Sequence, residues 1–233
     1  MRALWDLLAK PGNSVLQVGP GSGHLLAAAR RAGCSVTAVE SGKAQRDFIR
    51  DVWNIGSVYR SVDDIPASRS FDVIVVDDLE HVYDAVAFLR TVRQLLGDGG
   101  TCYLSAANAS SVEAAALRTW WPACKGSENV SFPSKAGLVA AAAESGLKPG
   151  RIWSTGLPLE LPVSALTAAR DRVLTARAAG WPAPSPDGVS TGRRASLANL
   201  YSVASLFDPG YRVLGALGRA GSLKATLTVR YMG

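Results

Sequence analysis

Short apolar runs alternate with amphipathic segments from residue 15 to residue 155. The runs have the length of buried strands, and the segments between them repeat apolar residues at helical spacing. This alternation predicts an α/β fold in which helices cover both faces of a doubly wound, mostly parallel sheet. We expect seven strands, at residues 15–18, 35–39, 57–61, 71–76, 101–106, 147–155 and 222–232.

The segments between these strands carry the start and stop signals of helices. Ser134 is suited to cap a helix that runs to Ser145, whereas Gly97, Gly99 and Gly100 are suited to end one. Asp63 and Asp64 fall in a turn before Pro66. The expected helices cover residues 2–9, 25–32, 42–53, 82–96, 111–120 and 134–145.

The alternation loosens after residue 106 and is interrupted between residues 156 and 206. In the second segment Pro162 suits a helix start and Gly180 a helix end, and a proline-rich loop follows. We interpret residues 109–130 and 156–206 as a helical substrate lid. The 233 residues suit one domain, spanning 1–233, with this insertion.

Composition narrows the class of protein. Hydrophobic residues make up 48% and charged residues 19%, which is typical of a globular chain. No apolar run is long enough to span a membrane, and the N-terminal segment resembles a helix more than a signal peptide, so we expect a cytoplasmic protein. Cys34, Cys102 and Cys124 form no C-x-x-C motif, and we expect buried, reduced thiols.

The positive charge lies in the last third of the chain. Residues 1–144 hold 14 Lys and Arg against 15 Asp and Glu, giving −1, and residues 145–233 hold 11 against 4, giving +7. A solvated face explains such an excess. That is the commonest cause, and a positive lid over an anionic substrate, a carrier-protein surface or RNA binding are the functional alternatives.

The stretch VLQVGPGSG, residues 15–23, combines a strand, a glycine turn and a helix start. Gly19, Gly21 and Gly23 permit positive φ and let a nucleotide-like ligand lie against bare backbone at a helix N-terminus. The dinucleotide fingerprint needs glycine at the sixth place, which His24 occupies. The G-x-G-x-G spacing instead resembles motif I of the class I methyltransferases that use S-adenosylmethionine.

Acidic residues follow the other predicted strands. In an open α/β sheet the carboxyl ends of the strands meet at one edge, which here gathers the glycine turn, Glu40, Asp63 or Asp64, and residues 77–81. Glu40 is suited to accept both hydroxyls of a ribose. A solvated glutamate at a strand end is the alternative.

Residues 71–108 also resemble class I methyltransferases, through F-D-x-I, L-E-H-V, L-x-x-G-G and a strand that closes in Asn. Together with motif I and Glu40, the similarity covers roughly residues 10–155, and the resembling sub-group includes ubiquinone-pathway O-methyltransferases and small-RNA 2′-O-methyltransferases. It implies that the glycines cradle the methionine end of S-adenosylmethionine and that Glu40 binds the ribose. It further implies that Asp63 or Asp64 faces the adenine amine, and we count Asp77 among the cofactor-binding residues.

Gln17 departs from the pattern of the resembling families, which usually carry Asp or Glu two residues before the first glycine. An amide oxygen can still accept a hydrogen bond from the cofactor's ammonium. It does so without charge assistance, so we expect weaker binding at this position.

Asp77, Glu80 and His81 form D-x-x-E-H, close to the E-x-x-E-H that supplies metal ligands in the resembling sub-group. Carboxylates and an imidazole suit Mg²⁺ or Zn²⁺, and Glu128 falls near the place of a further ligand. His81 is alternatively a metal-free general base or a substrate contact, and we count Glu80 with it as a candidate catalytic residue. A third interpretation gives the segment only a structural role at a helix start.

Together with these patterns, the resemblance implies a methyltransferase that acts on an oxygen of a small molecule, either anionic or aromatic, and the resemblance alone implies natural-product or secondary metabolism. RNA methylation is a second hypothesis, suggested by the basic last third. A non-methylating protein that retains the fold is a third, for which Gln17 is the one argument.

Overall fold

A computed structural model of the protein describes residues 4, 8, 10–77, 79–121, 123–124, 129–155 and 222–229. The contacts divide the chain into two compact units. The first comprises Met1–Ala107, Val130–Ile152 and Lys224–Gly233, and the second comprises Asn108–Asn129 and Trp153–Leu223. The predicted lid segments nearly coincide with the second unit. Residues 156–206 lie outside the described residues, so the lid stays a prediction.

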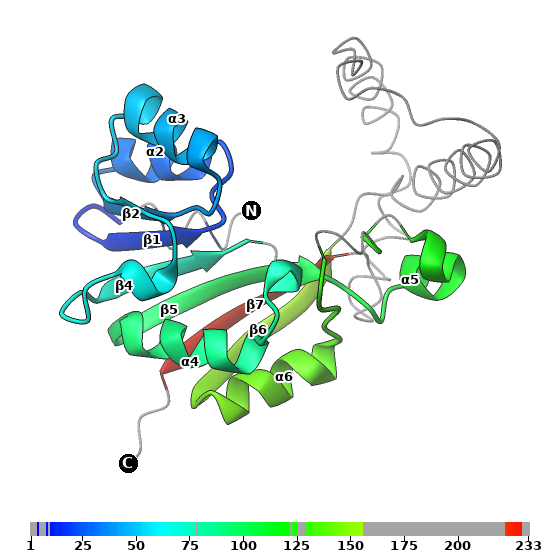
Figure 1. Ribbon diagram of the computed structural model, residues 1–233. Coiled ribbons are helices and arrows are strands. Elements are labelled where there is room, and N and C mark those ends of the chain that lie inside the picture. Colours follow the sequence, from blue (N-terminus) through cyan, green and yellow to red (C-terminus); the bar gives the residue numbers. More distant parts are fainter. Residues whose placement is uncertain are drawn as a thin grey trace, which may run out of the picture. The chain divides into compact units, whose positions relative to one another are not determined.

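Seven strands form one mostly parallel sheet, as the sequence predicts. They are β1 (Ser14–Val18), β2 (Ser35–Val39), β3 (Val58–Tyr59), β4 (Phe71–Val76), β5 (Leu96–Ala107), β6 (Leu147–Thr155) and β7 (Ser222–Val229). Their order is β3-β2-β1-β4-β5-β7-β6 (Figure 1). Neighbouring strands from β3 to β5 run parallel, and the chain winds outward in opposite directions from β1 and β4.

The helices of the first unit cover both faces of this sheet. They are α2 (His24–Arg31), α3 (Lys43–Trp53), α4 (Ala85–Leu95) and α6 (Lys135–Glu144), with 3₁₀ turns η1 (Val62–Asp64) and η2 (Leu79–His81). Because crossovers between parallel strands are right-handed, winding in opposite directions places α2 and α3 on one face and α4 on the other. The helix α6 packs beside α4 (Figure 1).

Local signals produce several of these elements as predicted. Ser134 caps α6, since its Oγ accepts a hydrogen bond from Gly137 N at 3.0 Å. The central strand β4 is buried from Val73 to Val76, which is typical of a strand covered on both faces. The last strand, β7, alternates between buried and half-buried residues.

The prediction that a helix ends before Gly97, Gly99 and Gly100 is confirmed, since α4 ends at Leu95, but these glycines belong to β5, which begins earlier than the expected residue 101. Leu96 pairs with Phe71 of β4, but Thr101 pairs with Val73, so extra β5 residues bulge out of the register. A Cβ at Gly100 would lie 2.9 Å from the Phe71 carbonyl oxygen. Glycine therefore allows a close approach of two strands here.

Two other predicted elements are shorter in the structure. The third strand pairs only at Val58 and Tyr59, not over residues 57–61. The helix expected from residue 82 begins at Ala85, because Asp84 caps it: Asp84 Oδ1 accepts from Ala87 N at 2.9 Å. The residues before it form η2 instead.

The described part of the second unit begins with a capped helix. Ser111 caps α5 (Val112–Leu117), and its Oγ accepts from Ala114 N at 3.0 Å. The single helix predicted over residues 111–120 is wrong, because Arg118 has φ +51° and ends α5. A 3₁₀ turn, η3 (Arg118–Trp120), follows and leads to the buried Trp121.

The prediction of buried thiols holds for two cysteines. Burial raises the pKa of Cys102 to about 12 and also raises the pKa of Cys34, so both thiols stay protonated. Cys124 is exposed, contrary to the prediction. Within the described ranges, no helix is long and apolar enough to cross a membrane.

The central strands β1 and β4 are joined at their amino ends by a side chain. Asp72 Oδ2 accepts hydrogen bonds from Ser14 N at 2.8 Å and from Ser14 Oγ at 2.7 Å. These bonds, the backbone one first, lower the pKa of Asp72. The charged carboxylate therefore stabilises the pairing of the two strands.

We expect Asp72→Ala to lower the free energy of unfolding by about 0.5–1 kcal/mol at pH 7, a small loss because Asp72 is exposed. A carboxyl whose pKa is lowered by folding stabilises the protein above its unfolded pKa of about 3.9, and the benefit disappears as pH falls through the folded pKa. The difference from wild type, measured by urea unfolding, should narrow below about pH 4. Asp98→Ala, at another exposed aspartate, is the control. A difference that is constant with pH would contradict the interpretation.

Candidate functional site

Three residues follow the carboxyl ends of neighbouring strands and continue the sheet's hydrogen bonding. Gly19 N donates to Val39 O at 3.0 Å, Glu40 N to Tyr59 O at 3.0 Å, and Asp77 N to Val18 O at 3.2 Å. The glycine turn, Glu40 and Asp77 therefore meet at one edge of the sheet, as the sequence predicts.

The glycine turn adopts the predicted conformation. Gly19, Gly21 and Gly23 have φ of +72°, +53° and +73°. A Cβ at Gly23 would lie 3.1 Å from side-chain atoms of both Ile49 and Trp53, so packing also requires glycine there. Apart from Gly21 and its two chain neighbours, no atom of the described residues lies within 4 Å of the Cβ position at Gly21, which leaves room for a ligand in the middle of the turn.

Trp53, at the end of α3, contacts the glycine turn with its indole ring. Its Nε1 donates to Ser22 O at 2.7 Å, and its ring packs edge-on against His24 with 5.3 Å between ring centres. No sequence pattern points to Trp53, because none links a residue at the end of one helix to the start of another. His24 begins α2 and is exposed.

Glu40 lies half-buried beside the turn, and its carboxylate is oriented by the chain itself. Gly42 N donates to Glu40 Oε1 at 2.8 Å. Arg46 Nη1 donates to Glu40 O at 2.9 Å and so fixes the backbone of the same residue. Such an anchored carboxylate suits the recognition of paired hydroxyls.

The two candidate aspartates of η1 make different hydrogen bonds. Asp64 Oδ2 accepts from Ser61 N at 2.9 Å and completes a capping box, so that its carboxylate serves the turn. Asp63 Oδ2 accepts from Ser61 Oγ at 3.2 Å. Both side chains are exposed, and a contact with an adenine amine stays a prediction for either.

Gln17 and Asp77 are in direct contact. Gln17 Nε2 donates to Asp77 Oδ2 at 2.6 Å, and Ser105 Oγ donates to Asp77 Oδ1 at 3.3 Å. Burial, together with the negative charge of Asp77, raises the pKa of the Tyr103 phenol on β5. Asp77 therefore presents an oriented negative charge next to the glycine turn.

Glu80 has a backbone-holding role that the sequence did not predict. The residue is only 7% exposed, and its Oε2 accepts from Ala107 N at 3.2 Å. Its carbonyl oxygen accepts from Val130 N at 2.8 Å and from Ser131 N at 3.1 Å. Glu80 thus connects Ala107 to Val130 and Ser131, which lie on either side of residues 108–129 in the sequence. These contacts give Glu80 a structural role other than the one predicted at a helix start, and its part in catalysis stays a prediction.

His81 follows Glu80 with an exposed side chain, so an imidazole lies at this edge of the sheet. Among the described residues, no three or more His, Cys, Asp or Glu side chains form a group that could hold a metal ion. The described residues therefore do not support the metal ion predicted at Asp77, Glu80 and His81, and we assign none. Glu128 lies outside the described residues.

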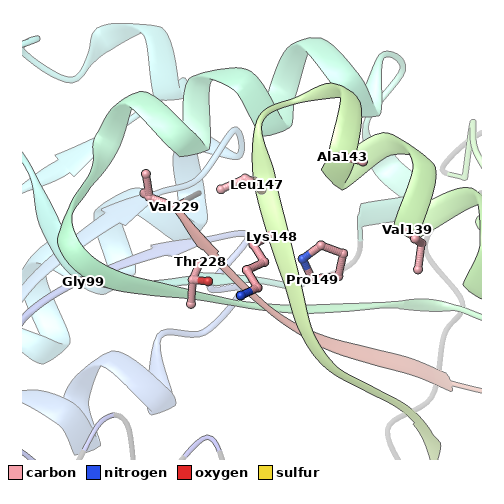
Figure 2. Close-up of a pocket in the computed structure, with 8 residues that line it drawn as sticks. All are labelled: Gly99, Val139, Ala143, Leu147, Lys148, Pro149, Thr228 and Val229. Carbon is pink, nitrogen blue, oxygen red and sulfur yellow. The ribbon is translucent and has the colours of Figure 1, made fainter. Parts of the chain in front are cut away.

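A pocket of about 740 Å³ lies elsewhere, where β5 and β6 begin and β7 ends (Figure 2). It is lined mainly by apolar groups, including Val139, Leu147 and Val229, with the Lys148 ammonium and the Thr228 hydroxyl at its wall. Because β5 and β6 begin here, this pocket is distinct from the edge that carries the glycine turn.

Comparisons with known proteins show which proteins this chain is similar to. Residues 1–149 match the family described as "Methyltransferase domain". The ubiquinone biosynthesis O-methyltransferase of Xanthomonas campestris pv. campestris (strain B100) is 36% identical over 109 residues, which cover 43% of this chain and 46% of that protein. The enzyme of the same name from Xanthomonas oryzae pv. oryzae (strain PXO99A) is 33% identical over 105 residues, covering 42% and 44%. The chain thus spans less than half the length of these curated relatives.

Solved structures share the fold at low sequence identity. An S-adenosylmethionine-dependent methyltransferase from Mesorhizobium loti is 18% identical with a TM-score of 0.59, over 97% of this chain and 94% of that chain. The geranyl diphosphate C-methyltransferase of Streptomyces coelicolor A3(2) is 17% identical with a TM-score of 0.58, over 98% and 79%. At these identities the likeness supports the fold alone.

We expect Glu80→Ala to lower the free energy of unfolding by about 1–3 kcal/mol, because it removes a buried charged acceptor and leaves the Ala107 N–H without it. Urea unfolding at pH 7 measures the loss. Glu80→Gln keeps an acceptor oxygen and should lose less, while Glu144→Ala, at an exposed glutamate on α6, is the control. An Ala variant as stable as wild type would show that the Glu80 carboxylate does not stabilise the backbone at Ala107.

Proposed function

Because the chain belongs to the class I S-adenosylmethionine-dependent methyltransferase family, we propose that it transfers a methyl group from S-adenosylmethionine to an oxygen of a small-molecule acceptor. The glycine turn carries this proposal. Three glycines at positive φ, with open space over Gly21, form a cradle for a ligand at the start of α2. When bound, S-adenosylmethionine supplies an electrophilic methyl group on its sulfonium sulfur.

The residues at the sheet edge fit that cofactor. We propose that the glycine turn holds its methionine end, that Glu40 accepts hydrogen bonds from its ribose hydroxyls, and that Asp63 faces its adenine. Asp63 is preferred to Asp64, since the Asp64 carboxylate already closes the capping box. The anchored Glu40 carboxylate costs no reorganisation when it meets two hydroxyls.

For the chemical step we propose that the enzyme positions the acceptor oxygen and that His81 removes its proton. The exposed imidazole lies on η2, which follows the carboxyl end of β4. Histidine is the commonest general base near neutral pH. The names of the curated relatives support oxygen as the methylated atom and a biosynthetic role.

Calorimetric titration with S-adenosylhomocysteine tests the cofactor site. We expect micromolar binding, which Glu40→Ala weakens by about 1 kcal/mol or more, or roughly fivefold, because hydrogen bonds to a charged acceptor are lost. Asp47→Ala, on the exposed face of α3, removes a carboxylate that pairs with Lys43 and should leave the affinity unchanged. Absence of binding to wild type would overturn the proposed function.

A second measurement tests the base. With S-adenosylmethionine and a catechol as the probe acceptor, we expect His81→Ala to lower kcat by about 100-fold, the usual contribution of general base catalysis. The affinity for S-adenosylhomocysteine should not change, because His81 is assigned to the acceptor side. An unchanged kcat would remove His81 from the mechanism.

A further inference from the structure

Gln17 is a buried amide in the middle of the sheet. It lies on β1, in register with Ala38 of β2 and Val75 of β4, and is only 3% exposed. Its Nε2 donates to Asp77 Oδ2 at 2.6 Å. Because an ionised carboxylate only accepts hydrogen bonds, the amide nitrogen must face Asp77 and the amide oxygen must point away from it.

This orientation has an energetic cost. Gln17 Oε1 is buried and has no hydrogen-bond partner among the described residues. Burying an acceptor without a partner destabilises a protein, whereas methionine has nearly the same length and no such group. Packing alone therefore favours an apolar residue at position 17, and the amide needs another explanation.

Asp77 supplies that explanation. It is partly exposed, whereas Gln17 is not, so a ligand in the glycine turn can reach the Asp77 carboxylate but not the amide. The two sites adjoin, because a Cβ at Gly19 would lie 3.2 Å from the Asp77 carbonyl oxygen. Two donors, Gln17 Nε2 and Ser105 Oγ, fix both oxygens of the carboxylate.

We propose that Asp77 binds the α-ammonium group of the cofactor and that Gln17 is its positioning residue. The negative charge that related families usually carry on β1, two residues before the first glycine, is thereby moved to the end of β4. A glutamate at position 17 would bring two carboxylates into contact, so the amide is the residue that keeps a single, oriented charge here. This inference rests on the proposed function.

Two ligands distinguish this role from a structural one. S-adenosylhomocysteine carries the α-ammonium group, whereas 5′-methylthioadenosine lacks the whole amino-acid portion. We expect Asp77→Asn to weaken calorimetric binding of S-adenosylhomocysteine at least tenfold and Gln17→Met to weaken it three- to tenfold. Neither change should alter 5′-methylthioadenosine binding more than twofold.

Stability and coupling provide two further readouts. Gln17→Met should unfold at a temperature no lower than wild type, because it removes the buried acceptor without a partner. Thr37→Val, at a buried polar residue of β2 that pairs with Leu16 next to Gln17, is the matched control and should leave both affinities unchanged. The Gln17→Met/Asp77→Asn double variant should bind no more weakly than Asp77→Asn, since Gln17 acts through Asp77.

The outcomes are separable. If wild type binds neither ligand, the proposed function and this inference both fail. If wild type binds S-adenosylhomocysteine but Asp77→Asn and Gln17→Met bind it normally, or lose both ligands equally, the inference alone is overturned. Additive losses in the double variant would also overturn it, because Gln17 would then act independently of Asp77.

Discussion

The parallel pairing of β1 with β4 is the constraint on which the structure depends. The winding of the chain reverses at this pair, so the carboxyl ends of both strands open onto the same edge. Side chains join the two strands at both ends, Ser14 to Asp72 at one and Gln17 to Asp77 at the other. The contact at the carboxyl end forms part of the proposed cofactor site, so the element that organises the sheet also organises the chemistry.

The carboxylates considered as functional candidates fall into two groups according to what surrounds them. Glu80 and Asp64 carry carboxylates that the sequence marked as functional, yet both bind backbone N–H groups of their own surroundings. Glu40 and Asp77 are also held by nearby donors, but they lie beside an open glycine turn. Position relative to the turn, rather than residue type, distinguishes a carboxylate that serves the fold from one available to a ligand.

Predictions succeeded where a few neighbouring residues decide the outcome. The positive φ of Gly19 and Gly23 and the cap at Ser134 follow from local stereochemistry and local hydrogen bonds. They failed where a distant strand intervenes. The helix before Gly97 ends as expected, but Gly99 and Gly100 continue into β5, where a Cβ at Gly100 would lie 2.9 Å from the Phe71 carbonyl oxygen.

The sequence by itself determined the α/β architecture, the family and the glycine turn, because periodicity and glycine spacing are properties of short segments. Only the tertiary structure decided which side chains meet. Gln17 and Asp77 are 60 residues apart, and their contact depends on the register of two strands. The roles of Trp53 and Glu80 likewise arise from contacts with segments distant in sequence, which no local preference specifies.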